Sequence, residues 1–196
     1  MDTLSVVRGI HATYRRRRTF EPINNNRQSE GGEDAPCDCE TWGATQLVIR
    51  RDVDMVVDMN DYTNDRWGKQ ESCEMLLAIE RARALGVPYI DRTNYPIQEI
   101  VRRFNTTFFT NTIDYMIALA LYEEYRHLEF YGVNMAHGSE YSYQRPGIHY
   151  WLGRAEECGT TVIIHEPSTL LQTDNGLMYG YDIPMQEGMD KWGIST

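Results

Sequence analysis

Continuous apolar runs alternate with segments of helical spacing over most of this chain. Apolar runs of strand length, bounded by turn residues, predict strands, and apolar residues at helical spacing predict amphipathic helices. The predicted strands span residues 3–7, 40–45, 53–58, 87–90, 127–132 and 160–165. The predicted helices span residues 70–85, 97–104, 113–125 and 147–158. This alternation, with short connections, predicts a three-layer α/β fold: a mostly parallel sheet of about six strands with helices on both faces.

Two segments depart from this pattern. Residues 10–36 are rich in Arg, Asn, Glu and Gly and show little periodicity, which predicts a long loop or insertion within a single domain over residues 1–176. Residues 177–196 carry Tyr179, Tyr181 and Trp192 among glycines and a proline. Such a segment is too apolar for a free tail, so we expect it to pack on the domain or on a partner subunit of a homo-oligomer.

Charge and composition narrow the class of partner. The 196-residue chain has a net charge of −10, which argues against general nucleic-acid binding, because that affinity depends on Lys and Arg neutralising phosphates. The basic run Arg15 to Arg18 is the exception, and it is interpreted as a solvated loop or an interface patch. No apolar run has the length of a membrane span and the first residues lack the order of a signal peptide. A soluble, cytoplasmic protein is therefore expected.

Cysteines and acidic residues offer few metal ligands. The four cysteines are too few and too scattered for a disulfide framework, and Cys37 with Cys39 would supply only half of a zinc site. Asp58 and Asp61 follow a predicted buried strand. They would supply oxygen ligands to Mg²⁺ beside phosphates, or they form a turn and cap the next helix. Apart from this magnesium, no cofactor is predicted.

The loop after the predicted strand 127–132 is the first candidate for a binding site. Ligands of open α/β sheets bind outside the carboxyl ends of the strands, so Asn134 and the following residues are expected to contact a nucleotide. Tyr141, Tyr143 and Arg145 would stack on a base and pair with a phosphate. Alternatively they form the entry turn of a helix that starts near Pro146. No glycine-rich dinucleotide motif, P-loop or nucleophile-elbow motif occurs.

A second candidate site is the start of the predicted helix 113–125. Thr110, Asn111 and Thr112 are all competent N-cap residues. Capping needs one of them, and a phosphate bound at the positive end of the helix would use the others.

Three histidines are candidates for acid–base chemistry. His137 lies in the loop itself and is either a catalytic base or a solvated residue. His149 is placed to pack or to cap a helix. His165 ends the last predicted strand, where it either faces the same crevice as the loop or closes the sheet.

The order of elements around this loop resembles a known group of proteins. The motifs are Gly132-Val133-Asn134-Met135, Ser139-Glu140-Tyr141-Ser142-Tyr143, Gln144-Arg145-Pro146 and Glu166-Pro167-Ser168-Thr169-Leu170-Leu171. Together they resemble a group of uncharacterised bacteriophage proteins of Rossmann-like fold. That group is similar to bacterial lipooligosaccharide sialyltransferases and to the Rossmann-like domain of archaeal hydroxymethyl-dihydropterin pyrophosphokinase. The resemblance covers residues 40–171, and it would place the protein in the host cytoplasm.

The resemblance implies roles for particular residues. Thr45 and Gln46 stand where the sialyltransferases contact the nucleotide, and Thr112 stands where they have a small hydroxyl residue near it. Tyr141 matches a tyrosine that hydrogen-bonds the leaving phosphate. The general-base histidine of that family has no clear counterpart after this loop, so His137 or His149 would have to replace it.

Three functions follow as hypotheses. The first is a nucleotide-dependent transferase for glycosyl or pyrophosphoryl groups, with His137, Tyr141 and Arg145 as catalytic residues. The second is a nucleotide-binding or ligand-sequestering accessory protein without chemistry. The third is a structural or interaction protein that works through its aromatic tail and its basic run.

Overall fold

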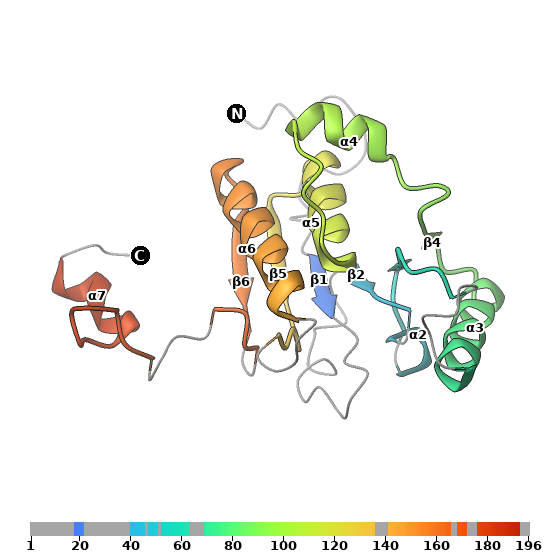
Figure 1. Cartoon of the computed structure of the whole chain (residues 1–196), viewed down its shortest axis with the longest axis horizontal. Coiled ribbons are helices and arrows are strands. Elements are labelled where there is room, and N and C mark those ends of the chain that lie inside the picture. Colours follow the sequence, from blue (N-terminus) through green and yellow to red (C-terminus); the bar gives the residue numbers. More distant parts are fainter. Residues whose placement is uncertain are drawn as a thin grey trace.

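The computed structural model shows an α/β fold, which confirms the predicted class (Figure 1). It describes residues 18–21, 40–45, 47–50, 52–62, 69–135, 141–165, 168–171 and 176–192. The strands are β1 (Arg18–Glu21), β2 (Glu40–Gly43), β3 (Met55–Val57), β4 (Tyr89–Ile90), β5 (His127–Phe130) and β6 (Thr161–Ile164). The helices are α2 (Leu47–Arg50), α3 (Lys69–Ala84), α4 (Ile97–Phe104), α5 (Thr112–Tyr122), α6 (Tyr141–Glu157) and α7 (Met185–Lys191).

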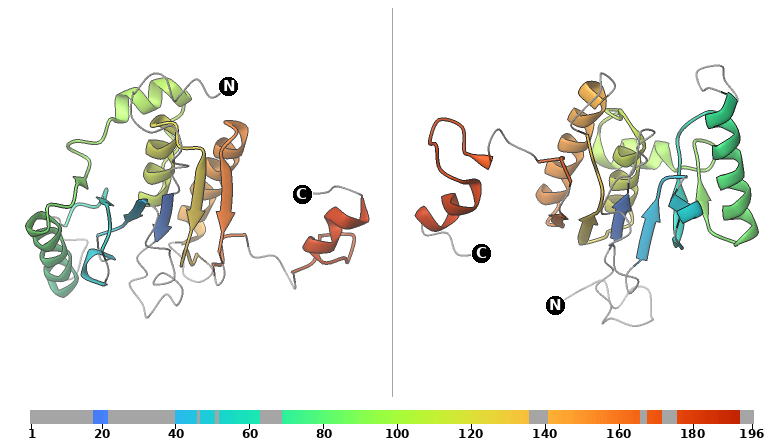
Figure 2. Two further views of the ribbon diagram at one scale, coloured as in Figure 1. Left: turned by 180° about the vertical axis from the view of Figure 1, so that it is seen from behind. Right: turned by 90° about the horizontal axis from the view of Figure 1, so that it is seen from below.

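The strands form one sheet in the order β4-β3-β2-β1-β5-β6. Every neighbouring pair is parallel, so all carboxyl ends lie at one edge of the sheet. The arrow of β1 points to this edge, at the bottom of Figure 1. β2, β3 and β4 follow one another outward on one side of β1, and β5 then pairs with the other side of β1. The direction of winding therefore reverses between β1 and β5, with β5 and β6 completing the other half of the sheet (Figure 2).

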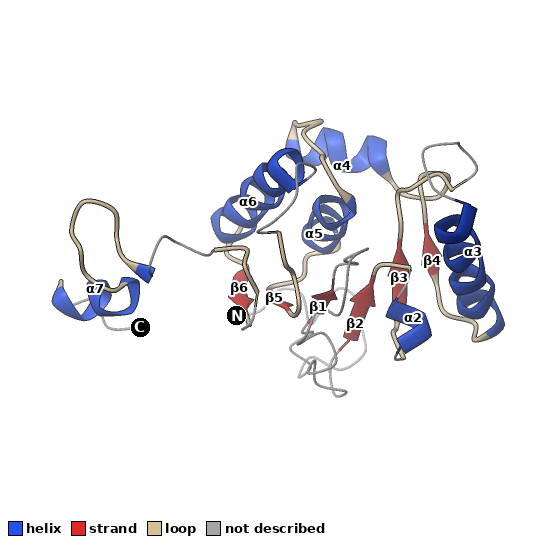
Figure 3. Ribbon diagram, turned by 60° about the horizontal axis from the view of Figure 1, so that its bottom comes forward, coloured by secondary structure: helices blue, strands red, loops and turns tan. Residues whose placement is uncertain are grey.

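Apolar side chains are buried on both sides of β3. Successive residues of a strand point to opposite faces, and Met55 and Val57 belong to the large core that packs under α4, α5 and α6. Val56, between them, belongs to a second cluster with residues of α2 and α3. Figure 3 shows these two sets of helices relative to the sheet. Met55, Val56 and Val57 are all buried, on alternate faces of the sheet, and this explains why the strand appears as a continuous apolar run in the sequence.

Helix α5 is the most deeply buried helix in the described part of the chain. Buried residues occupy eight of its eleven positions, including Met116 and Ile117. Asn111 is its N-cap, since the side chain of this residue accepts hydrogen bonds from the backbone N–H groups of Ile113 and Asp114. The amino end of α5 is thereby fixed at the carboxyl edge of the sheet.

The structure departs most from the predicted elements at two places. A strand, β1, lies within residues 10–36, where a loop was predicted, whereas the predicted strand 3–7 lies outside the described residues. The four residues of β1 contain no apolar run, and a strand this short is paired through its backbone groups, which leave no pattern in the sequence. Helix α6 starts at Tyr141 rather than at residue 147, so that Pro146 lies inside it. Its first turn exposes Ser142 and Tyr143 and so shows no apolar stripe.

The last described residues form a small unit of their own. Leu177 and Pro184 form an isolated antiparallel bridge, and α7 follows directly. Tyr181 and Trp192 are in edge-to-face contact within the unit, which lies beside the sheet domain in Figures 1 and 2. Residues 172–175, which connect the two, are outside the described residues, and the partner on which the tail packs stays a prediction. Among the helices described, none has the length and apolar character needed to cross a membrane.

Candidate functional site

The carboxyl edge of the sheet collects most of the polar side chains that the sequence singled out. It comprises the residues that follow β2, β3, β5 and β6 and the amino ends of α5 and α6. The described residues form three polar clusters, centred on Asp58, on Asp114 and on Glu129, each of which is buried. They differ in what surrounds the carboxylate.

The Asp58 cluster lies at the end of β3. One oxygen of Asp58 accepts hydrogen bonds from the hydroxyl groups of Thr45 and Tyr62, and the other accepts from the backbone and side-chain amides of Asn60. Burial raises the pKa of Asp58 above its usual value, although these four hydrogen bonds act against the shift. Burial and the charge of Asp58 together raise the pKa of Tyr89 to about 12. Thr45, a predicted nucleotide contact, is fully buried in this cluster, and Gln46 lies outside the described residues.

The predicted magnesium ligands point to protein partners. Asp61 forms an ion pair with Arg92 at 2.8 Å, and Asp58 accepts the four hydrogen bonds given above. Within the described ranges, no three His, Cys, Asp or Glu side chains are grouped to hold a metal ion. Magnesium binding at Asp58 and Asp61 stays a prediction, and Cys37 and Cys39 lie outside the described residues.

The Asp114 cluster joins the amino ends of α5 and α6. Asp114 is fully buried and accepts hydrogen bonds from the backbone N–H of Thr110 at 2.7 Å, from its hydroxyl at 2.9 Å and from the Asn111 amide at 2.9 Å. The carbonyl of Gln144 on α6 lies 2.8 Å from the Thr110 hydroxyl and 3.0 Å from the Asn111 amide. Burial raises the pKa of Asp114 to about 6, against the effect of these hydrogen bonds.

Gly147 allows the two helices to approach at this point. A Cβ atom at Gly147 would collide with the carboxylate of Asp114 and the hydroxyl of Thr110. Thr110 and Asn111, two of the predicted phosphate contacts, thus serve the contact between the helices and the cap of α5. Thr112 is the first residue of α5 and is half-buried.

The segment 168–171 ties the end of β5 to α6. The hydroxyl of Ser168 donates to the carbonyl of Val133 at 2.6 Å, and the backbone N–H of Met135 donates to the hydroxyl of Thr169 at 2.8 Å. Asn134 lies between Val133 and Met135 in the sequence. Its side-chain oxygen is buried and has no hydrogen-bond partner among the described residues. A buried polar atom in this position is a natural acceptor for a ligand's donor group.

The predicted catalytic residues are only partly described. Arg145 reaches the carbonyl of Leu170 at 3.3 Å, and His149 contacts the same carbonyl at 2.7 Å. Tyr143 is 77% exposed on the first turn of α6, and Tyr141 begins that helix, with a side chain that is not described. His137 lies outside the described residues. The structure thus brings Asn134 and Arg145 to one region through residues 168–171, and it leaves the role of His137 a prediction.

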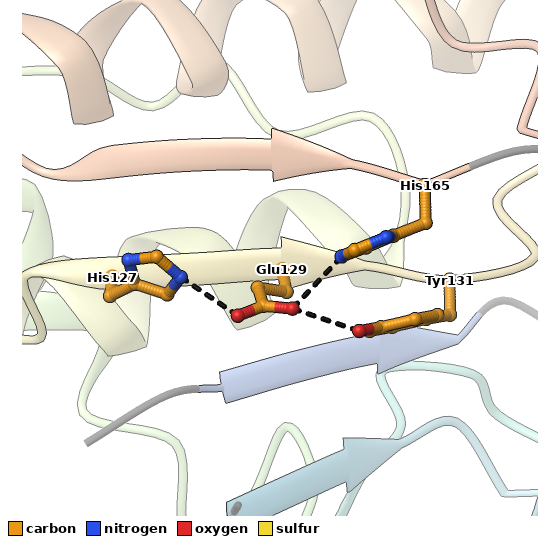
Figure 4. A network of polar contacts seen from close by, with 4 residues as sticks. All are labelled: His127, Glu129, Tyr131 and His165. Atoms are coloured by element: carbon orange, nitrogen blue, oxygen red, sulfur yellow. Dashed lines mark hydrogen bonds and ion pairs between the residues drawn. The ribbon is translucent and has the colours of Figure 1, made fainter. Parts of the chain in front are cut away.

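The Glu129 cluster lies across β5 and β6, on the face opposite the large core (Figure 4). The carboxylate of Glu129 contacts Nε2 of His127 at 2.8 Å with one oxygen, and Nε2 of His165 at 2.9 Å and the hydroxyl of Tyr131 at 2.8 Å with the other. The rings of Tyr131 and His165 are stacked with centroids 4.1 Å apart and planes 9° apart. Burial acts to raise the pKa of Glu129, but hydrogen bonds from Tyr131, His165 and His127 outweigh it and hold the pKa below its usual value.

The Glu129 cluster was missed in the sequence. Its signal was the alternation of His127, Glu129 and Tyr131 along an otherwise apolar strand, because residues two apart on a strand share one face. His165 joins them through strand pairing. The backbone N–H of His165 donates to the carbonyl of Phe130 at 2.9 Å, and no sequence pattern reveals this register.

The fold and these clusters define an α/β protein whose sheet carries polar side chains at its carboxyl edge, next to the point between β1 and β5 where the strand order reverses. Comparison with protein-family models, with curated proteins and with solved structures found no match to this chain.

Proposed function

We propose that this chain has a three-layer, Rossmann-like fold and is a nucleotide-dependent transferase that binds its donor at the carboxyl edge next to β5. The observation that carries the proposal is the strand order, which reverses between β1 and β5. At such a reversal the connections leave the sheet towards opposite faces, and the space between them is where ligands of open α/β sheets bind. The apolar clusters on both sides of β3 are consistent with the three layers.

Side chains near this point suit a phosphate-bearing ligand. Asn134 follows β5 with a buried oxygen that has no partner among the described residues, and a ligand hydroxyl or amine would satisfy it. Arg145 brings a guanidinium to the first turns of α6, and this group suits the paired oxygens of a phosphate. Tyr143 presents an exposed ring on which a base can stack.

A non-catalytic nucleotide-binding protein is the second candidate. One observation favours it: the N-cap of α5 is occupied by Asn111, and Thr110 is engaged by Asp114 and Gln144. The side chains of Asn111 and Thr110 are thus used by the protein itself, and a leaving phosphate would have to bind elsewhere. The two candidates share the ligand and differ in whether it is consumed.

A thermal-shift screen against nucleoside mono-, di- and triphosphates and nucleotide sugars tests the shared part. A ligand at a hundredfold excess over Kd stabilises the folded state by about 2.7 kcal/mol. Asn134→Ala should reduce this stabilisation. Gln98→Ala is the control, because it also removes a side-chain amide but from an exposed position on α4, at the opposite end of the domain in Figure 1. This variant should show the same stabilisation as wild type. A screen in which no nucleotide stabilises the wild-type chain would reject both candidates.

Turnover separates the two candidates. With the donors that bind, a transferase releases nucleotide or pyrophosphate, and Arg145→Ala and Tyr141→Phe should slow that release. If the bound donor is recovered unchanged with every acceptor offered, the chain is the non-catalytic binder.

A further inference from the structure

The Glu129 cluster holds two imidazole rings in defined orientations. Glu129 is ionised at neutral pH, because its pKa lies below the usual value, and a carboxylate only accepts hydrogen bonds. Nε2 of His127 and Nε2 of His165 must therefore each donate to it. In a neutral imidazole that carries its proton on Nε2, the other nitrogen, Nδ1, is a proton acceptor. Glu129 thus selects the tautomer of both rings.

The two rings differ in how far a ligand can reach them. The side chain of His165 is 35% exposed and that of His127 is 21% exposed, whereas Glu129 between them is 5% exposed. His165 directly follows the last residue of β6 at the carboxyl edge, and His127 is the first residue of β5, at the amino end of that strand. Figure 4 shows the resulting row, with His127 at the start of β5 and His165 just beyond the end of the neighbouring strand, β6.

The surroundings of His165 fix its ring as well as its tautomer. The ring stacks on Tyr131, whose hydroxyl donates to the same Glu129 oxygen that His165 contacts. The backbone of His165 is fixed by its hydrogen bond to Phe130. An oriented imidazole backed by a carboxylate is the arrangement by which enzymes hold a general base.

We propose that His165 is the general base of the transfer reaction and that Glu129 is its positioning residue. This inference rests on the proposed transferase function. Nδ1 of His165 accepts the proton of the acceptor's hydroxyl group while the hydroxyl oxygen forms a bond to the electrophilic carbon or phosphorus of the donor. The bond between that atom and the phosphate oxygen of the nucleotide or pyrophosphate breaks, and the leaving group takes the electron pair. The proton stays on His165 until it passes to solvent.

Two histidine variants form a matched test, because both remove one imidazole from the same carboxylate. His165→Gln should lower turnover by roughly 10²–10⁴-fold, the usual contribution of a general base. His127→Gln should leave turnover within about tenfold of wild type, because this ring supports Glu129 without reaching the ligand. Both variants should keep the nucleotide-induced thermal shift. Equal losses in the two variants, or wild-type turnover in His165→Gln, would overturn the assignment.

The tautomers provide a readout that does not depend on activity. Long-range ¹H–¹⁵N spectra of the wild-type chain should show His127 and His165 protonated on Nε2 with Nδ1 unprotonated. In Glu129→Gln the amide presents one donor and one acceptor, so at least one of the two rings must change tautomer, whereas Tyr131→Phe should leave both unchanged. A wild-type His165 protonated on Nδ1 overturns the proposal even if the chain is a transferase. If the chain binds nucleotides and consumes none, the transferase and the base fail together, while the tautomers still decide the positioning role of Glu129.

Discussion

Asp114 and Glu129 are both buried carboxylates, yet their surroundings shift their pKa values in opposite directions. The hydrogen bonds to Asp114 within the described chain come from Thr110 and Asn111, which are neutral, and they do not compensate for burial. Glu129 has a phenol and two imidazoles, which more than compensate. The first cluster closes a contact between two helices, and the second leaves a partly exposed ring at the edge where ligands are expected. Burial of a carboxylate alone therefore does not identify a functional site. The chemical type of its hydrogen-bond partners, and whether one of them is exposed to a ligand, distinguish the two clusters.

The largest effect should come from removing the carboxylate of the Glu129 cluster. Glu129→Leu leaves one phenol and two imidazoles without their acceptor, and we expect a loss of about 2–3 kcal/mol in the free energy of unfolding, because each unsatisfied polar group costs about 1–3 kcal/mol and the histidines regain some water. Urea denaturation measures this loss. Glu129→Gln is the control and should lose less than half as much. Equal stability of the leucine variant and wild type would show that the cluster is not formed.

The pH dependence of stability should separate the two carboxylates. The pKa of Asp114 is raised in the folded state, so the folded protein binds this proton more tightly than the unfolded chain, and the contribution is present at low pH and lost as pH rises through about 6. Between pH 7 and pH 4.5 this group should add about 2 kcal/mol, since the folded-state pKa of about 6 lies about 1.5 units above pH 4.5 and one pKa unit corresponds to about 1.4 kcal/mol.

Asp114→Asn has no carboxyl proton at this position and should lack that gain. The contribution of Glu129 has the opposite sign: it is present at neutral pH and is lost as pH falls below the usual glutamate pKa, through the lower value in the folded state. Denaturation curves of wild type, Asp114→Asn and Glu129→Gln at several pH values measure both terms. Parallel pH profiles for all three proteins would contradict the comparison.

A smaller effect should follow from filling the contact between α5 and α6. Gly147→Ala places a Cβ against the carboxylate of Asp114 and the hydroxyl of Thr110 and should lower stability by about 1–3 kcal/mol, as overpacking does. Gly153→Ala on the same helix meets nothing within 4 Å and should raise stability by up to about 1 kcal/mol through helix propensity. Thermal denaturation of both variants measures the difference, and a gain in both would show that the contact is loose.

The smallest effect on stability is expected at Tyr143. Its side chain is 77% exposed, so Tyr143→Ser should change the free energy of unfolding by less than about 0.5 kcal/mol. If the ring stacks on a base, the same change should weaken nucleotide affinity, by about 1–3 kcal/mol. Isothermal titration calorimetry of wild type and Tyr143→Ser, with the nucleotide that binds best, measures the two affinities. Equal affinities would show that the ring does not stack on the base.

The sequence predicts those elements whose side chains carry a pattern. α3 and α4 and the strands β3, β5 and β6 were found close to their observed bounds, because their apolar positions follow the periods of a helix or a buried strand. β1 was missed because its four residues are held by backbone pairing to β2 and β5. The start of α6 was missed because its first turn faces water.

The candidate site was harder to predict than the fold, because its residues come together through register. Asn134 and Arg145 were expected at the carboxyl edge, and the structure places them at the end of β5 and at the start of α6. The pairing of His165 with Glu129 depends on the parallel register of β5 and β6, which only the assembled sheet defines.

Protection of His165 by a nucleotide is the most direct test of the central claim, that the ligand binds at the carboxyl edge within reach of this ring. Diethyl pyrocarbonate modifies unprotonated imidazoles, and peptide mass spectrometry gives the rate at each histidine with and without the nucleotide that binds best. At a hundredfold excess over Kd about one site in a hundred is empty, so modification of His165 should slow by at least about tenfold. The rate at His127 should stay the same. An unchanged rate at His165, or equal protection of His127, would contradict the account.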